Sequence, residues 1–257
     1  MRQITDMALI RPLYDGWGDN LARSTLDGCM GRAWANDALT AAKIINGDFA
    51  CIAGYPSAPE AEELVRFLPD DYASAWLLTV SKDDAWNGTI ERALGEKASK
   101  IERYAIRRAS GFDCERLQGF VEALPEGYTL AFIDEKLYAE AKRNDWSCDF
   151  VSQFANAADY VRRGLGVAVL HQGEMVAGAS SYVVFGDGIE IEIDTLEAHR
   201  RKGLALACAS KLILACMQRG LYPSWDASNL HSVALAEKLG YQLERPYATY
   251  SYHTGRS

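Results

Sequence analysis

The sequence predicts a mixed α/β fold in two domains, with helices packed on a mixed (α+β) sheet, and three features lead to this prediction. Apolar and acidic residues alternate over Ile189–Asp194, and a basic glycine turn and a helical pattern over Leu204–Arg219 follow. Short apolar runs joined by glycine turns precede that unit, as in an antiparallel meander. Short strand and helix patterns also occur near the amino terminus, and 49% hydrophobic with 24% charged residues is ordinary for a globular chain.

Residues 1–110 are expected to form an amino-terminal α/β domain of unknown role. Phe49–Gly54 and Trp76–Ser81 are typical of short buried strands, and Ala58–Leu68 of a helix that ends before Pro69. No motif in this part of the sequence points to chemistry, so packing is the simplest role for it. One interpretation is a degenerate half-copy of the second domain, although the sequence shows no internal repeat.

A charged segment followed by a glycine marks the expected domain boundary. Lys97–Arg108 is rich in Lys and Arg, but Glu102 interrupts it, which favours a solvated face over a basic binding patch. The Ser110-Gly111 pair follows this segment. The second domain is therefore expected to cover residues 111–257.

The second domain is expected to begin with helices and strands in alternation. Helices are predicted over Cys114–Ala123 and Glu135–Arg143, with a strand over Tyr128–Asp134 between them. Asn156 is expected to cap a further helix that ends at Gly164. Three strands joined by tight glycine turns then form a meander, and they cover Gly166–Gln172, Met175–Phe185 and the segment from Ile189.

The strand at Ile189–Asp194 has isoleucines on one face and Glu190, Glu192 and Asp194 on the other. Burying three carboxylates on a covered sheet face is costly, so the carboxylates of this face are expected to be exposed to water or paired with a cationic group. The basic turn Arg200-Arg201-Lys202-Gly203 then leads into the long helix. Because exposed N–H groups at a helix start attract anions, the turn predicts an anion-binding site.

Two further elements are expected after this helix. Leu221–Ala227 is typical of a strand, and Pro223 within it fits either an edge strand or a strand that parts from its neighbour. Asn229 is expected to cap a helix over Leu230–Leu239, which Gly240 ends.

The run Arg200-Arg201-Lys202-Gly203-Leu204-Ala205 fits the Arg/Gln-x-x-Gly-x-Gly/Ala signature, so the chain resembles the GNAT (GCN5-related) N-acetyltransferases. The order of elements is similar too: an acidic strand, a helix, a strand-like segment, then Asn229, Ser232 and the ending Lys238-Leu239-Gly240-Tyr241. The chain looks most similar to the GNAT acetyltransferase-like subfamily that includes the zwittermicin A resistance acetyltransferase. The close resemblance spans roughly Phe112 to Tyr250, and a looser one covers the amino-terminal part.

This resemblance implies the GNAT acyl-CoA N-acyltransferase fold and a site for acetyl-CoA, and the half-copy interpretation of the first domain becomes a degenerate GNAT-like half. In this family the loop amides hold the pyrophosphate, and the two strands beside the helix part in a V into which pantetheine inserts. Gly203 keeps that backbone approach open, while Asn229 has helix capping as its other role. The implied cofactor-binding residues are Ile193, Thr195, Arg200, Arg201, Lys202, Gly203, Leu204, Ala205, Asn229 and Ser232.

The resemblance also suggests catalytic residues on the acidic strand. Glu192 is the expected general base that takes the proton from the amine, with Glu190 and Asp226 as second choices. The alternative is an ordinary solvent-exposed sheet face. Many GNAT enzymes have a Tyr as general acid where this chain has Ala236, so solvent, Ser232 or a nearby Tyr is left to protonate the leaving thiolate.

Charge and composition limit the partners. The formal net charge of -8 and a pI of about 5.1 argue against nucleic acid and favour a cationic substrate. No apolar run is long enough to span a membrane, and a cytoplasmic protein is expected. The Cys residues form no C-x-x-C pair and the His residues are scattered, so neither a metal site nor a disulfide frame is expected, and most Cys are expected to be buried.

The resemblance implies an enzyme that moves the acetyl group of acetyl-CoA directly to a primary amine of a small molecule, such as an antibiotic or metabolite. The alternative is a non-catalytic protein of GNAT fold that binds CoA or sequesters a ligand, which the missing Tyr motivates. The sequence identifies neither the acceptor nor the acyl-chain preference. It also leaves the oligomeric state open, and a homodimer is one state that it allows.

Overall fold

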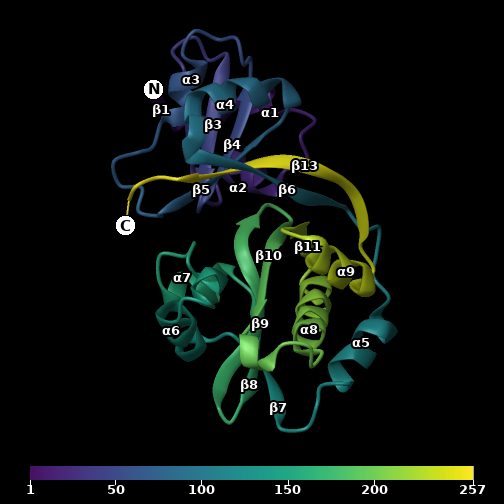
Figure 1. The fold of residues 1–257 in the computed structure, drawn as a ribbon. Coiled ribbons are helices and arrows are strands. Elements are labelled where there is room, and N and C mark those ends of the chain that lie inside the picture. The colour runs from purple at the N-terminus through teal and green to yellow at the C-terminus, as the bar shows by residue number, and fades with distance from the viewer. Residues whose placement is uncertain (257) are drawn as a thin grey trace. The chain divides into compact units, whose positions relative to one another are not determined.

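The computed structural model describes residues 1–256, which form two compact units (Figure 1). The first unit contains Met1–Arg103 and the segment from Pro246 onward, and the second contains Tyr104–Arg245. This division lies earlier than the expected boundary at Gly111. It also returns the end of the chain to the first unit, because the last strand pairs there.

The first unit consists of short strands and short helices. Its strands are β1 (Arg2–Ile4), β2 (Arg32–Ala35), β3 (Ala41–Asn46), β4 (Phe49–Gly54), β5 (Trp76–Ser81) and the later part of β13 (Gln242–His253). Its helices are α1 (Arg11–Tyr14), α2 (Asn20–Leu26), α3 (Ala61–Arg66) and α4 (Asn87–Leu94), with 3₁₀ helices η1 (Met7–Leu9), η2 (Asp84–Trp86) and η3 (Gly95–Lys97).

The strands of the first unit lie in the order β1-β2-β3-β4-β5-β13. Only β4 and β5 are parallel, and all other neighbours in this order pair antiparallel. Both strands predicted in this part, β4 and β5, are confirmed to the residue. The expected helix at Ala58–Leu68 is shorter at both ends, because the chain turns at Ala58–Pro59 and leaves the helix at Phe67.

The second unit holds the longer elements. Its strands are the later part of β6 (Ala98–Arg107), β7 (Tyr128–Phe132), β8 (Gly166–His171), β9 (Glu174–Phe185), β10 (Gly188–Thr195), β11 (Tyr222–Ser224) and β12 (Asp226–Ala227). Its helices are α5 (Cys114–Glu122), α6 (Glu135–Arg143), α7 (Ala157–Arg163), α8 (Leu204–Gln218) and α9 (Leu230–Leu239), with 3₁₀ helices η4 (Cys148–Phe150) and η5 (Glu197–His199).

A five-stranded sheet in the order β11-β10-β9-β8-β7 forms the centre of the second unit. The strands β7 to β10 pair antiparallel, which confirms the predicted meander, whereas β11 runs parallel to β10. The predicted cap of α7 is also confirmed, since Asn156 Oδ1 accepts a hydrogen bond from Asp159 N at 2.9 Å.

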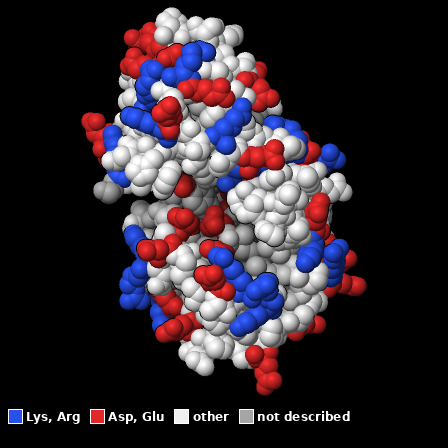
Figure 2. All heavy atoms as spheres, viewed as in Figure 1, with Lys and Arg blue, Asp and Glu red and all other residues white. Residues whose placement is uncertain are grey.

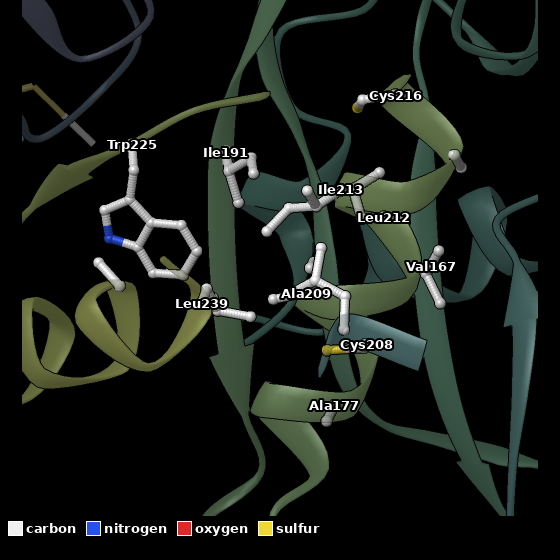
Figure 3. Close-up of a cluster of buried hydrophobic side chains, with 14 of the residues drawn as sticks. Val167, Ala177, Ile191, Cys208, Ala209, Leu212, Ile213, Cys216, Trp225 and Leu239 are labelled. Carbon is white, nitrogen blue, oxygen red and sulfur yellow. The ribbon is translucent and has the colours of Figure 1, made fainter. Parts of the chain in front are cut away.

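The two faces of this sheet carry different layers. Ala177 and Ala179 of β9 belong to the buried cluster that includes Leu212 of α8, and Figure 3 shows α8 packed against the strands through such residues. Gly178 points the other way, where a Cβ would come within 2.5 Å of the Phe150 ring. Successive residues of a strand face opposite sides. The helix α8 therefore covers one face, and η4 lies against the other.

The two units share one order of elements. In the first, a strand and two helices (β1, α1, α2) precede the meander β2-β3-β4, and α3, the parallel strand β5 and α4 follow. In the second, β7, α6 and α7 precede β8-β9-β10, and α8, the parallel strand β11 and α9 follow. A degenerate half-copy would produce this correspondence.

Two predicted segments differ from the structure. The single strand expected over Leu221–Ala227 is wrong, because β11 pairs with β10 whereas β12 pairs antiparallel with β6. The buried Trp225 lies between the two short strands. The charged segment before the expected boundary is the strand β6, whose half-buried and exposed residues gave no apolar strand pattern.

Candidate functional site

The strands β10 and β11 pair over only part of the length of β10. Their parallel pairing covers Gly188 to Glu190 on β10 and ends at the pair Glu190–Ser224. Beyond this point β10 continues to Thr195, while the chain after β11 turns to pair with β6. The predicted parting is thus present, and β11 is also the edge strand of its sheet, so Pro223 satisfies both interpretations left open by the sequence.

The side chain of Trp225 packs on the apolar side of β10, at the point where β11 leaves β10. Its indole Nε1 donates a hydrogen bond to Ser232 Oγ at 3.1 Å, and its ring centroid lies 5.7 Å from that of Tyr241. Figure 3 shows the ring next to Ile191 of β10 and Leu239 of α9. The side chain therefore fixes α9 against the sheet where β11 ends.

The basic loop and the start of α8 form an exposed anion-binding geometry. Arg201 and Gly203 have left-handed backbones, with φ of 61° and 79°. Within residues 1–256, no side chain caps α8 and no acidic residue lies in its first turn. A Cβ on Gly203 would meet no described atom within 4 Å, so the approach to the first N–H groups is open. Figure 2 shows Lys and Arg gathered on the surface of this part of the second unit.

The arginine that opens the loop is turned back toward the strand. Arg200 Nε donates to the Thr195 carbonyl oxygen at 2.9 Å, and its Nη2 lies 3.4 Å from Asp194 Oδ1. The Thr195 N–H donates to Asp194 Oδ1 at 2.6 Å. Both backbone groups of Thr195 thus have protein partners, so Ile193 is the better candidate for pairing with a ligand.

The acidic face of β10 is more enclosed than an ordinary solvent-exposed sheet face. Asp194 is paired with Arg200, as expected, while Glu190 is buried with 8% of its surface exposed and Glu192 is half-buried. Glu192 lies opposite Ser180 in the β9–β10 register. Ser180 Oγ donates to the Phe150 carbonyl oxygen at 2.7 Å, so this face meets the layer around η4 rather than bulk water.

Asp226 does not share the strand of the other two carboxylate candidates. It lies on β12 and is half-buried opposite Ala105 of β6. Glu190 and Glu192 lie together on β10. The structure thus groups two of the three predicted catalytic residues on one strand face.

The start of α9 confirms the predicted cap. Asn229 Oδ1 accepts hydrogen bonds from the backbone N–H groups of His231 and Ser232, each at 3.0 Å. The expected general-acid position, Ala236, is buried with 0% exposure. Ser232 Oγ accepts the Trp225 bond, which leaves its own hydroxyl proton for another acceptor.

Sequence reasoning missed a cluster at the basic loop, here called the Tyr128 cluster: Tyr128, His171, His199 and Lys202. The Tyr128 hydroxyl lies 2.9 Å from His199 Nδ1 and accepts a hydrogen bond from Lys202 Nζ at 3.1 Å. The His171 ring lies 4.8 Å from the Tyr128 ring and 5.2 Å from the His199 ring. Tyr128 of β7 and His171 of β8 lie opposite each other in the strand register. Their proximity could have been predicted only by knowing that register, because the His residues are scattered in the sequence.

The Cys residues and the remaining metal-binding side chains show no further site in the described chain. Cys51, Cys208 and Cys216 are buried as expected, but Cys29 and Cys148 are half-buried and Cys114 is exposed. Burial raises the pKa of the Cys208 and Cys216 thiols to about 12, which keeps them protonated and unreactive.

Residues 1–256 contain no group of three or more His, Cys, Asp or Glu side chains that could hold a metal ion. No helix among them has the length and apolar character to cross a membrane.

Comparison with known proteins identifies related sequences and structures. Residues 11–250 match the family model described as GNAT acetyltransferase. A curated protein of Bacillus subtilis (strain 168), named Uncharacterized N-acetyltransferase YdfB, is 30% identical over 172 residues. That match covers 66% of this chain and 64% of the relative, so it spans less than two thirds of the relative's length.

Two solved structures illustrate the fold. A GCN5-related N-acetyltransferase-like protein from Streptococcus suis 89/1591 has a TM-score of 0.89 at 37% identity, covering 96% of this chain and 98% of that one. A GCN5-related N-acetyltransferase from Kribbella flavida has a TM-score of 0.63 at 17% identity, covering 92% and 95%, which shows the fold alone. The predicted mixed α/β fold is confirmed, and the family match extends over both units.

Proposed function

This chain belongs to the GNAT acetyltransferase family, and we propose that it transfers the acetyl group of acetyl-CoA directly to a primary amine of a small molecule. One observation carries the proposal: β10 continues beyond its pairing with β11 and then leads, through a basic loop, into α8, whose start has no side-chain cap. A thioester donor with a pyrophosphate needs both features, a slot for its arm and an anion site for its phosphates.

In this proposal the pyrophosphate binds at the first turn of α8. The N–H groups of Gly203, Leu204 and Ala205 point out of the helix start, where the helix dipole favours negative charge. Arg201 and Lys202 are exposed beside them and add positive charge. Pantetheine would then pass along Ile193, on the part of β10 beyond its pairing with β11.

The acetyl group would pass directly to the amine, without an acyl-enzyme, through a tetrahedral intermediate. A neutral amine attacks the thioester carbonyl carbon, the new C–N bond forms, and the C–S bond breaks to release the CoA thiolate. Glu192 would first take a proton from the ammonium form of the acceptor, directly or through one water, and solvent would take the second proton as the amide forms. Ser232 or solvent would give a proton to the thiolate, which is a fair leaving group because a thiol has a pKa near 8.5.

Charge on the β10 face supports an amine as acceptor. Glu190 and Glu192 lie on the same face, and the formal net charge of the chain is -8. Such a face attracts a protonated amine and helps to hold it before its proton is removed. We propose that this reaction takes place in the cytoplasm.

A second function is favoured by one observation. Ala236 is buried where many relatives have a catalytic Tyr. A chain without a general acid could bind CoA and a ligand but turn over too slowly to act as an enzyme. The alternative is therefore a non-catalytic CoA-binding or ligand-sequestering protein of GNAT fold.

A screen for released thiol separates the two functions. The full chain is incubated with acetyl-CoA and a library of primary amines, and free CoA is measured with a thiol reagent, with heated protein as the control. Amine-dependent thiol release that exceeds the heated control supports the enzyme. Tight acetyl-CoA binding with no release over the whole library would favour the binding protein, and no binding at all would exclude both.

A further inference from the structure

The Tyr128 cluster lies immediately beside the proposed pyrophosphate site, and its three rings have no role in that proposal. Lys202 belongs to both, since it stands one residue before Gly203 and donates to the Tyr128 hydroxyl at 3.1 Å. His199 stands one residue before Arg200 and meets the same hydroxyl at 2.9 Å. The cluster is therefore joined to the loop through two residues of one short segment.

The chemistry of the cluster fits an aromatic anion. Its three rings come from three elements, Tyr128 from β7, His171 from β8 and His199 from η5, and their centroids lie 4.8 to 5.7 Å apart. Lys202 Nζ lies 5.7 Å from the centre of the Tyr128 ring. Tyr128, His171 and His199 are half-buried and Lys202 is exposed, so faces and donors of the cluster remain accessible to a ligand.

The local field of the cluster is positive. Partial burial, Lys202 and His171 together hold the pKa of His199 below its usual value, so like charge already crowds this imidazole. Its contacts come from every element of the cluster, the Tyr128 hydroxyl of β7, the His171 ring of β8 and Lys202 of the loop. A bound dianion would relieve this repulsion and accept charge-assisted hydrogen bonds from Lys202 and the imidazoles.

We propose that the Tyr128 cluster is a subsite for the 3′-phosphorylated adenosine end of CoA. The inference rests on the proposed function, in which acetyl-CoA is the donor. In CoA the ribose 3′-phosphate is the anionic group next to the pyrophosphate, one sugar away, just as the cluster is next to the loop. Lys202 and the imidazoles bind the phosphate monoester, and the ring of Tyr128 offers a face on which adenine stacks.

A comparison of two ligands tests this subsite. Isothermal calorimetry measures the affinity of the full chain for CoA and for dephospho-CoA, which differ only in the 3′-phosphate. We expect CoA to bind about 10- to 100-fold more tightly, the worth of one or two charge-assisted hydrogen bonds. Adenosine 3′,5′-bisphosphate should compete with CoA, whereas inorganic phosphate at the same concentration should not.

Two variants assign the preference to the cluster. His171→Gln and Tyr128→Phe should each reduce the preference for CoA to about 3-fold or less while leaving the affinity for dephospho-CoA within about 2-fold. His253→Gln, on the exposed strand end of the first unit, is the matched control and should keep the full preference. Circular dichroism verifies that each variant is folded.

Each outcome has a distinct meaning. Equal affinity of the unmodified chain for both ligands would overturn the subsite and leave the proposed donor intact, and this result needs no variant. Variants that weaken both ligands equally would also overturn it, because the cluster would then only support the loop. If neither ligand binds, the proposed donor itself fails, and the subsite fails with it.

Discussion

Arg200 donates a hydrogen bond from Nε to the carbonyl oxygen of Thr195 at 2.9 Å, which ties the basic loop to the end of β10. The same guanidinium forms an ion pair with Asp194, at 3.4 Å from Nη2 to Oδ1. Arg201, its neighbour, has a left-handed backbone and an exposed side chain. Two adjacent arginines therefore have different jobs, one in shaping the loop and one in facing the solvent at the proposed phosphate site.

The first prediction separates these jobs. Arg201→Ala should weaken acetyl-CoA binding by about 1 to 3 kcal/mol, as the loss of one charge-assisted contact would. Thermal stability should change little, because the Arg201 side chain is exposed. Arg200→Ala should lower both affinity and melting temperature, since the loop loses its tie to β10. Calorimetry and thermal unfolding check both variants, and unchanged affinity in Arg201→Ala would remove that residue from the site.

The second prediction concerns Gly203 at the start of α8. Any side chain there is strained by about 1 kcal/mol, because φ is 79°. A side chain would also enter the open space in front of the helix N–H groups. Gly203→Glu should abolish CoA binding, because its charge would lie where the pyrophosphate is proposed. Gly203→Gln has the same size and strain without the charge, and it should retain more affinity than Gly203→Glu. Equal, unimpaired binding by both folded variants would refute the pyrophosphate site.

Local patterns in the sequence were enough for the meander and for the turn into α8. Glycine turns delimit β8, β9 and β10, and the apolar pattern after Gly203 is typical of a helix over its whole length. The charged segment that became β6 could not be predicted in this way. Its residues are half-buried or exposed, so its strand conformation depends on partners such as β12 and not on its own hydrophobic pattern.

The candidate site was predictable where it is local and missed where it depends on register. The loop residues follow one another in sequence, so Arg201 and Gly203 could be assigned together. Tyr128 and His171 are 43 positions apart in number and meet only because β7 and β8 pair at that register. The different roles of Arg200 and Arg201 could be assigned only from the structure, because the sequence does not tell which guanidinium folds back onto β10.

The third prediction concerns Lys43, which is fully buried in β3. Its Nζ donates to the carbonyl oxygens of Val65 and Phe67, at 2.8 and 2.7 Å, where α3 ends. Burial lowers the pKa of Lys43 to about 7 from 10.5. Below pH 7 Lys43 is charged in the folded chain as well, and the free-energy cost of burying that charge lowers the stability in full. As pH rises from about 7 to 10.5, the unfolded chain alone keeps the proton, so stability increases.

Lys43→Met isolates this contribution. Between pH 8 and 10, the stability of the unmodified chain relative to Lys43→Met should rise by about 1.4 kcal/mol per pH unit, the value for one proton. Denaturant unfolding at several pH values measures the difference. Other titrating groups are common to both chains and cancel. A difference that is constant over this range would show that Lys43 is protonated in the folded chain.

The fourth prediction concerns Glu192 as the general base. Glu192→Gln keeps the size of the side chain on β10 but cannot take a proton. It should keep acetyl-CoA affinity and lower the acetylation rate by roughly 10²- to 10⁴-fold at neutral pH, the usual worth of general base catalysis. The loss should shrink as pH rises, because more of the acceptor amine is then already deprotonated. Initial rates of thiol release from pH 7 to pH 10 measure the recovery.

Two matched variants decide between the carboxylates. Glu190→Gln changes a buried neighbour on the same strand face, and Asp226→Asn changes the candidate on β12. A defect in folding or in donor binding lowers the rate at every pH, so only the loss of a base recovers at high pH. If Glu190→Gln or Asp226→Asn shows the recovering loss while Glu192→Gln is fully active, the base is that residue. If all three variants keep full activity at neutral pH, solvent takes the proton, and the acidic face serves at most to attract the amine.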